Sequence, residues 1–127
     1  MNYLLDTNVF LWFIHGDQEL PEKFKDLIED PVNDIYISHA SLWEIAIKYS
    51  LGKLKLKRPF SDLVPGIIEE NSFSVLEIKT SHIVKIAELP YIHKDPFDRI
   101  IFAQSFVENI KMLYTDQIFD KYITLLK

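Results

Sequence analysis

The sequence predicts an α/β fold built on a mainly parallel β-sheet. Four short apolar runs, each bounded by turn residues, are separated by longer segments with the periodicity of buried helices. This alternation is typical of βαβ units, in which a helix returns the chain so that consecutive strands run parallel. The 127 residues suffice for one ordinary domain, and no repeat, low-complexity tract or linker divides them. We therefore expect residues 1–127 to form one domain.

The predicted strands lie at residues 3–5, 35–37, 73–76 and 112–114. A short helix between the first two begins after Pro21, because proline suits the first turn of a helix. Two helices are predicted between the second and third strands. One begins at Ser41 and ends at Gly52, with Leu42, Ile45, Ala46 and Tyr49 on its buried face. The other is capped by residues 61–62 and turns Leu63, Val64, Ile67 and Ile68 inward.

Two more helices are predicted before the last strand. The first begins at Ser81 and is ended by Pro90, and the second begins at residues 95–96, Asp-Pro, and is closed by Asn109. After the last strand, the pair at residues 122–123, Tyr and Ile, is expected to add a short edge strand.

Composition narrows the chemistry and the location of the protein. The chain has no cysteine, which excludes disulfides, thiol nucleophiles and zinc-thiolate sites. It has no apolar run of about 20 residues and no signal-peptide pattern, so we expect a cytoplasmic protein that does not enter a membrane. The net charge of −5 argues against a surface that is basic overall.

A local basic tract is nevertheless present. It consists of Lys48, Lys53, Lys55, Lys57 and Arg58, which are five of the 14 basic residues within eleven positions. The tract is a candidate surface for the phosphates of a nucleic acid, and an ordinary solvated, lysine-rich loop explains it equally well.

Four acidic residues are the main candidates for chemistry: Asp6, Glu44, Asp98 and Asp116. Asp6 and Asp116 follow predicted strands, and a doubly wound order places those strands side by side. Glu44 and Asp98 are expected in the first turns of helices that begin at the same carboxyl edge. Clustered carboxylates repel one another unless a cation neutralises them, and oxygen ligands favour Mg²⁺ or Mn²⁺. The pattern therefore predicts metal-dependent hydrolysis of a phosphodiester.

Each candidate also has a purely structural explanation. Ser41 and Glu44 fit a capping box, Asp98 suits the dipole of a helix start, and Asp6 and Asp116 suit turns.

His93 is expected to contact solvent or backbone and is left out of the catalytic set. Trp43 and Phe97 are expected to pack. Arg99 either pairs with an acid or reaches a phosphate.

The chain resembles the PIN-domain family, and more closely its VapC-like toxins. The resemblance lies in Tyr-Leu-Leu-Asp-Thr-Asn at 3–8, Ser-Leu-Trp-Glu-Ile-Ala-Ile-Lys at 41–48, His-Lys-Asp-Pro-Phe-Asp-Arg at 93–99 and Thr-Asp at 115–116. It implies a three-layer α/β/α domain and an endoribonuclease that uses Mg²⁺ or Mn²⁺ held by Asp6, Glu44, Asp98 and Asp116. The supporting groups that it implies are Thr7, Asn8, Asp95, Arg99 and Thr115.

The resemblance also implies an RNA substrate, a cognate antitoxin protein that covers the site, and a homodimer. Two other functions remain open. One is a binding module for RNA or antitoxin that has kept the fold without turnover. The other is a doubly wound phosphatase with Asp6 as covalent acceptor, although the Asp-x-Asp-x-Thr pattern of such enzymes is interrupted here by Asn8.

Overall fold

The structure is a computed structural model that describes the backbone of residues 1–126 and the side chains of residues 1–123. Its sheet has four parallel strands in the order β3-β2-β1-β4: β1 (Asn2–Leu5), β2 (Asp34–Ser38), β3 (Ser74–Leu76) and β4 (Lys111–Leu113). These strands confirm the predicted α/β class. The order reverses beside β1, because β2 pairs with one of its edges and β4 with the other. At such a reversal the neighbouring loops separate and leave a crevice at the carboxyl edge.

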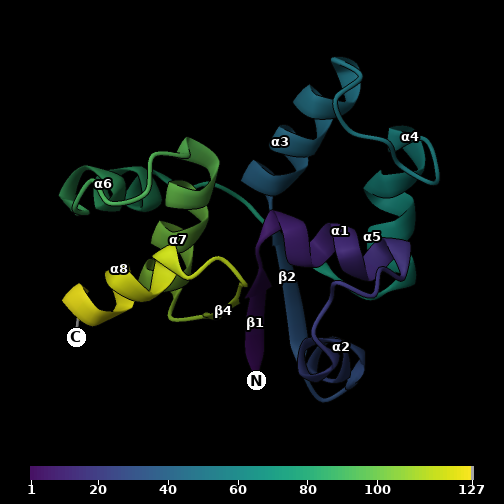
Figure 1. Cartoon of the computed structure of the whole chain (residues 1–127). Helices are drawn as coiled ribbons and strands as arrows, with labels where there is room; N and C mark the ends of the chain where they lie inside the picture. Colours follow the sequence, from purple (N-terminus) through teal and green to yellow (C-terminus); the bar gives the residue numbers. More distant parts are fainter. Residues whose placement is uncertain (127) are drawn as a thin grey trace.

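Helices cover both faces of the sheet, as the three-layer α/β/α prediction requires (Figure 1). One face carries α1 (Thr7–His15), α2 (Glu22–Glu29), α4 (Phe60–Asp62) and α5 (Ile68–Glu70). The other carries α6 (Thr80–Glu88), α7 (Pro96–Glu108) and α8 (Ile118–Leu126). Helix α3 (His39–Ser50) continues from β2 beyond the carboxyl ends of the strands. Among these described helices, none is both long and apolar enough to cross a membrane.

Two hydrophobic cores, one on each face, follow from the alternation of side chains along the strands. In β1, Tyr3 and Leu5 point to the core that includes Phe10 of α1, whereas Leu4 points to the core that includes Ile101 of α7. The central strand is therefore buried on both faces, as expected for a parallel sheet between helical layers. Because β1 is packed on both faces, it positions the next residue, Asp6, at the carboxyl edge of the sheet.

Three helices begin at that edge with a side-chain cap. Asp6 caps α1, Ser38 caps α3 and Asp95 caps α7, and each accepts a hydrogen bond from a backbone N–H two or three residues further on. The caps explain why the helices start where they do. They also bring three positive helix ends to one side of the molecule. Helix α1 was not among the elements that the sequence predicted.

Buried polar contacts tie β2 and β3 to α7. The Ser38 hydroxyl donates to Oε1 of Gln104 at 2.5 Å, and both side chains are fully buried. The amide nitrogen of Gln104 donates to the carbonyl oxygens of Leu76 and Glu77, at the end of β3. One side chain thus links the carboxyl ends of two strands to the helix that carries Asp98.

Some of the local predictions are wrong. Tyr49, expected on the buried face of α3, is exposed near the end of that helix. The helix expected after residues 61–62 is interrupted at Val64, whose backbone is extended (φ −125°, ψ 119°), because the residue before a proline is disfavoured in helical conformation. Val64 is accordingly exposed instead of turned inward. Tyr122 and Ile123 lie in helix α8, where Tyr122 stacks on Phe102 of α7, and they form no strand.

Candidate metal site

Asp6 is the central acid of the candidate site. It directly follows β1, its amide donates to the Leu113 carbonyl at 3.0 Å, and its Oδ1 accepts from the Val9 amide at 2.8 Å. The residue is only 4% exposed. Its place is therefore set by both neighbouring elements, the β1–β4 pair below it and the first turn of α1 beside it.

The pKa of Asp6 is affected by burial and by the charges of the three other acids. The pKa of Asp6 is raised from 3.8 to about 7, chiefly by burial. The Val9 hydrogen bond opposes this increase, and the negative charges of Asp98, Asp116 and Glu44 contribute to it. The three other acids come from α7, from the loop after β4 and from α3. The structure therefore gathers acids that are far apart in the sequence around one buried carboxyl group.

Glu44 faces the site from the second turn of α3, one turn later than expected. The predicted capping box does not form, because Ser38 caps the helix instead and Ser41 accepts a hydrogen bond from the Thr7 hydroxyl at 2.9 Å. Glu44 is buried, and its Oε2 lies 2.8 Å from Nζ of Lys48. Its Oε1 is buried and has no hydrogen-bond partner. An unpartnered buried carboxylate oxygen needs a compensating group, which a cation supplies.

Asp98 lies in the first turn of α7, as predicted. Its amide donates to the capping carboxylate of Asp95 at 3.0 Å. Burial and then the charge of Asp95 raise the pKa of Asp98 to about 6, while the nearby His93 opposes the increase. Asp116 is 57% exposed and accepts from the Ile118 amide at the start of α8. The two acids thus differ in burial, with Asp98 deeper in the crevice.

His93 joins these two acids, which the sequence analysis did not anticipate. Its Nε2 lies 2.8 Å from Oδ2 of Asp98 and 3.8 Å from Oδ2 of Asp116. The shorter contact does not have the angle of a hydrogen bond, so we describe it as electrostatic. The ring packs edge-on against Phe119, and the amides of residues 92 and 93 both donate to the Tyr122 hydroxyl. Contacts with α8 therefore aim this loop histidine into the site.

The predicted supporting residues separate into two groups. Thr7 is buried against Ser41, and Asp95 caps α7, so both stabilise the elements that carry the acids. Asn8 and Thr115 are exposed beside the site. Arg99 forms no ion pair with an acid in the described structure; it donates to the Ile86 carbonyl and lies over the Tyr91 ring. Its predicted contact with a phosphate stays a prediction.

The aromatic prediction is correct for Phe97 and only partly so for Trp43. The two rings meet edge-on, with centroids 5.1 Å apart, between α3 and α7. Trp43 is nevertheless 59% exposed, so it lines the surface beside Glu44 more than it fills a core.

The basic tract is divided by its contacts. Lys48 pairs with Glu44, Lys57 donates to the His15 carbonyl, and Arg58 pairs with Glu70 and Asp62. Within the described residues, the side chains of Lys53 and Lys55 make no ion pair or hydrogen bond and point into solvent. These two lysines are therefore the members of the tract best placed to meet a charged partner.

The acids fit a divalent cation in chemistry, although they do not form a finished coordination sphere. Carboxylate oxygens are the ligands that Mg²⁺ and Mn²⁺ prefer. The raised pKa of Asp6 and the unpartnered oxygen of Glu44 both indicate negative charge that a bound cation would neutralise. Among the described residues, no group of three or more Asp, Glu or His side chains is already arranged to hold a metal. Binding therefore requires the carboxylates to move together.

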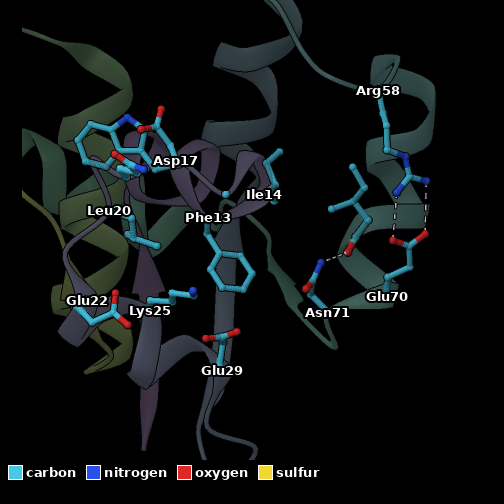
Figure 2. Close-up of a pocket in the computed structure, with 14 residues that line it drawn as sticks. Phe13, Ile14, Asp17, Leu20, Glu22, Lys25, Glu29, Arg58, Glu70 and Asn71 are labelled. Atoms are coloured by element: carbon cyan, nitrogen blue, oxygen red, sulfur yellow. Dashed lines mark hydrogen bonds and ion pairs between the residues drawn. The ribbon is translucent and has the colours of Figure 1, made fainter.

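A separate cavity of about 480 Å³ lies away from these acids, between the end of α1, α2 and α5 (Figure 2). Phe13 and Leu20 contribute apolar surface to it. Arg58 and Glu70 lie on its opposite wall, where they are held together by hydrogen bonds of 3.1 and 3.3 Å. Since these charges already satisfy each other and none of the four acids lines it, we assign no chemistry to this cavity.

Comparison with known proteins agrees with this geometry. The PIN domain family model matches residues 3–124. A segment of 56 residues, 44% of this chain, is 39% identical to ribonuclease VapC16 of Mycobacterium tuberculosis (strain ATCC 25618 / H37Rv), and it spans only 40% of that relative's length. The fold is similar to a chain in the crystal structure of VapBC2 from Rickettsia felis bound to a DNA fragment from their promoter, with a TM-score of 0.71 and 18% identity. This similarity covers 96% of this chain and 93% of that one.

By its fold and site, the protein belongs to the class of three-layer α/β/α proteins that gather acidic side chains at the carboxyl edge of a parallel sheet. Because the family model covers nearly the whole sequence, the chain belongs to the PIN domain family.

Proposed function

We propose that this protein is a metal-dependent endoribonuclease in which Asp6, Glu44, Asp98 and Asp116 hold Mg²⁺ or Mn²⁺. The observation that carries the proposal is a buried acid, Asp6, that interacts electrostatically with the other three acids, together with a buried Glu44 oxygen that has no hydrogen-bond partner. Folding brings these acids together at a cost to the metal-free protein, and a bound cation would offset that cost.

A divalent cation supplies two things to phosphodiester hydrolysis, namely a more acidic water molecule and neutralisation of charge on phosphate oxygens. The fold of the chain positions the acidic side chains. The β1–β4 pair and the α1 cap fix Asp6, the first turn of α7 fixes Asp98, and the Lys48 ion pair holds Glu44. No side chain is needed as a covalent nucleophile, which distinguishes this proposal from the phosphatase alternative.

The biological setting that we propose is a toxin–antitoxin pair. Support comes from the local identity to a ribonuclease named VapC16 and from the fold shared with a VapBC2 chain. On this basis we propose an RNA substrate, a cognate antitoxin that covers the acidic site, a homodimer and a cytoplasmic location. The test in cells is growth arrest when the protein is expressed without antitoxin, and normal growth with abundant folded protein would count against a toxin.

The enzymatic proposal is tested by incubating purified protein with total cellular RNA and Mg²⁺ or Mn²⁺, with EDTA as the metal-free control. Asp98→Asn should abolish cleavage, whereas Asp26→Asn, an exposed acid on α2, should not. Discrete products that disappear with EDTA and with Asp98→Asn would support the proposal. Absence of cleavage by folded, antitoxin-free protein would favour the alternative of a catalytically silent binding module.

The basic tract is tested separately. Charge reversal at Lys53, Lys55 and Lys57 is expected to weaken RNA binding and to reduce its salt dependence, because each phosphate contact contributes to counterion release. Affinity for Mn²⁺ should stay the same. The matched control is charge reversal of Lys23 and Lys25 on α2, and equal effects of the two sets would show that the tract is no specific surface.

A further inference from the structure

Lys48 belongs by its contacts to the acidic site and not to the rest of the basic tract. It lies one helical turn after Glu44 on α3, and its Nζ is 2.8 Å from Oε2 of that residue. The lysine side chain is 52% exposed and the glutamate side chain only 7%. The ammonium group therefore lies at the solvent-exposed edge of the acidic site, between solvent and the buried carboxylate of Glu44.

The two oxygens of Glu44 have different surroundings as a result. Oε2 accepts the hydrogen bond of Lys48, whereas Oε1 is buried and has no partner. A glutamate side chain with three rotatable bonds would otherwise sample several orientations. A single fixed partner on one oxygen leaves the other oxygen in a defined place. The ion pair thus occupies Oε2 and leaves Oε1 as the oxygen that is available for another partner.

Lys48 interacts with other acids of the site as well as with Glu44. Its contact is with Glu44, and its charge also interacts with those of Asp95 and Asp98. In the ion pairs described, Lys48 is the only member of the basic tract that contacts any of the four acids. Its position differs in this respect from that of Lys53 or Lys55.

We propose that Lys48 is a positioning residue of the metal site, which holds Glu44 through Oε2 so that Oε1 is presented to the divalent cation. The inference rests on the proposed metal-dependent function and deepens it. It has two opposing consequences. A fixed positive charge beside a metal ligand weakens the binding of a cation, and it also restricts the ligand to the orientation that hydrolysis needs.

The test substitutes Lys48→Met, which keeps much of the apolar stem and removes the charge. Calorimetric titration with Mn²⁺ alone should show binding about threefold to tenfold tighter, the size expected when a unit charge is removed near a divalent cation at a partly exposed site. With an RNA that the wild-type protein cleaves, kcat should fall at least about tenfold while KM stays within about twofold. Lys48→Arg keeps the charge and should retain wild-type Mn²⁺ affinity and part of the turnover.

A double-mutant cycle with Glu44→Gln identifies the route of the effect. The amide lacks the charge that the ammonium group pairs with, so in that background Lys48→Met should change the residual turnover less than about twofold. Mn²⁺ affinity should still increase, because the repulsion between the ammonium group and the cation does not depend on Glu44. Lys25→Met on α2 removes an exposed lysine that forms no ion pair within the described residues; it controls for loss of net charge and should leave Mn²⁺ affinity unchanged. If Lys48→Met fails to fold, Lys48→Gln carries the same prediction for Mn²⁺.

The outcomes separate the inference from the proposed function. Wild-type protein that binds no Mn²⁺ would overturn both. Wild-type protein that binds Mn²⁺ and cleaves RNA, combined with a Lys48→Met variant of unchanged kcat and KM, would overturn the positioning role alone. An increase of KM with unchanged kcat would also overturn it, because that result identifies Lys48 as a contact for RNA.

Discussion

Replacing Asp6 by asparagine should make the metal-free protein more stable at pH 8. The substitution removes a buried carboxylate whose pKa is raised to about 7, chiefly by burial. It keeps the cap of α1, because the asparagine Oδ1 can accept the same hydrogen bond from the Val9 amide, and asparagine caps helices about as well as aspartate. The variant therefore isolates the cost of the charge.

The magnitude follows from the difference between the folded and unfolded pKa values. Raising the pKa from 3.8 to about 7 costs the folded state about 4 kcal/mol at pH 8, since each tenfold change corresponds to about 1.4 kcal/mol. Between these two values the folded chain holds a proton that the unfolded chain has lost, so stability falls as the pH rises through that window. Burial of the new amide offsets about 1–2 kcal/mol. We expect a net gain of about 2–3 kcal/mol at pH 8 and a net loss of about 1 kcal/mol near pH 4, where the charge costs little and the amide penalty remains.

Urea unfolding in EDTA, followed by tryptophan fluorescence at pH 4, 6 and 8, measures these differences. Asp26→Asn on α2 is the control, because its side chain is exposed. Saturating Mn²⁺ should stabilise the wild-type protein and have little effect on Asp6→Asn. An Asp6→Asn variant that is no more stable than wild type at pH 8 would refute the argument that burial of charge at the site opposes folding.

Three further predictions concern the same framework. Mn²⁺ affinity should fall as the pH drops below about 7, because Asp6 and Asp98, with pKa values of about 7 and about 6, must release protons to bind a cation. Titration calorimetry between pH 5.5 and pH 8 measures this affinity, and an affinity that does not change with pH would contradict the prediction. Ser38→Ala should cost about 2–3 kcal/mol in urea unfolding, because it removes the cap of α3 and the bond to Gln104, whereas Ser61→Ala, on the surface, should cost under about 0.5 kcal/mol. Tyr122→Phe should leave two loop amides without their acceptor and increase hydrogen exchange at residues 92 and 93, and unchanged exchange there would show that the hydroxyl does not hold the loop.

The strands and the meeting of the acids were predictable from the sequence because both follow from local patterns. Short apolar runs identify buried strands, and in a parallel sheet the residues that follow such strands share one edge. Asp6 could be placed in this way. The same signals do not give orientation, so Glu44 was expected one turn too early on α3, and its pairing with Lys48 was not foreseen.

The missed helices show where periodicity fails. Residues 9–14, Val-Phe-Leu-Trp-Phe-Ile, form an unbroken apolar run without a 3.6-residue period, so nothing in the run itself indicated α1. In α8 the signal was present, since Phe119, Tyr122 and Ile123 recur at helical spacing, but the Tyr-Ile pair suggested a strand. The role of His93 depends on the Tyr122 hydroxyl, a contact across the fold that no local pattern contains.

The contact between the Tyr122 hydroxyl and the loop of His93 makes the order of synthesis relevant. Asp6 leaves the ribosome early, whereas Tyr122 and the rest of α8 leave it last of the parts that build the site. On a growing chain the loop before α7 therefore lacks its anchor, and β1 lacks its neighbour β4. The proposed nuclease would be assembled only after α8 has been synthesised, so the messenger RNA being translated would not meet the assembled site before that point.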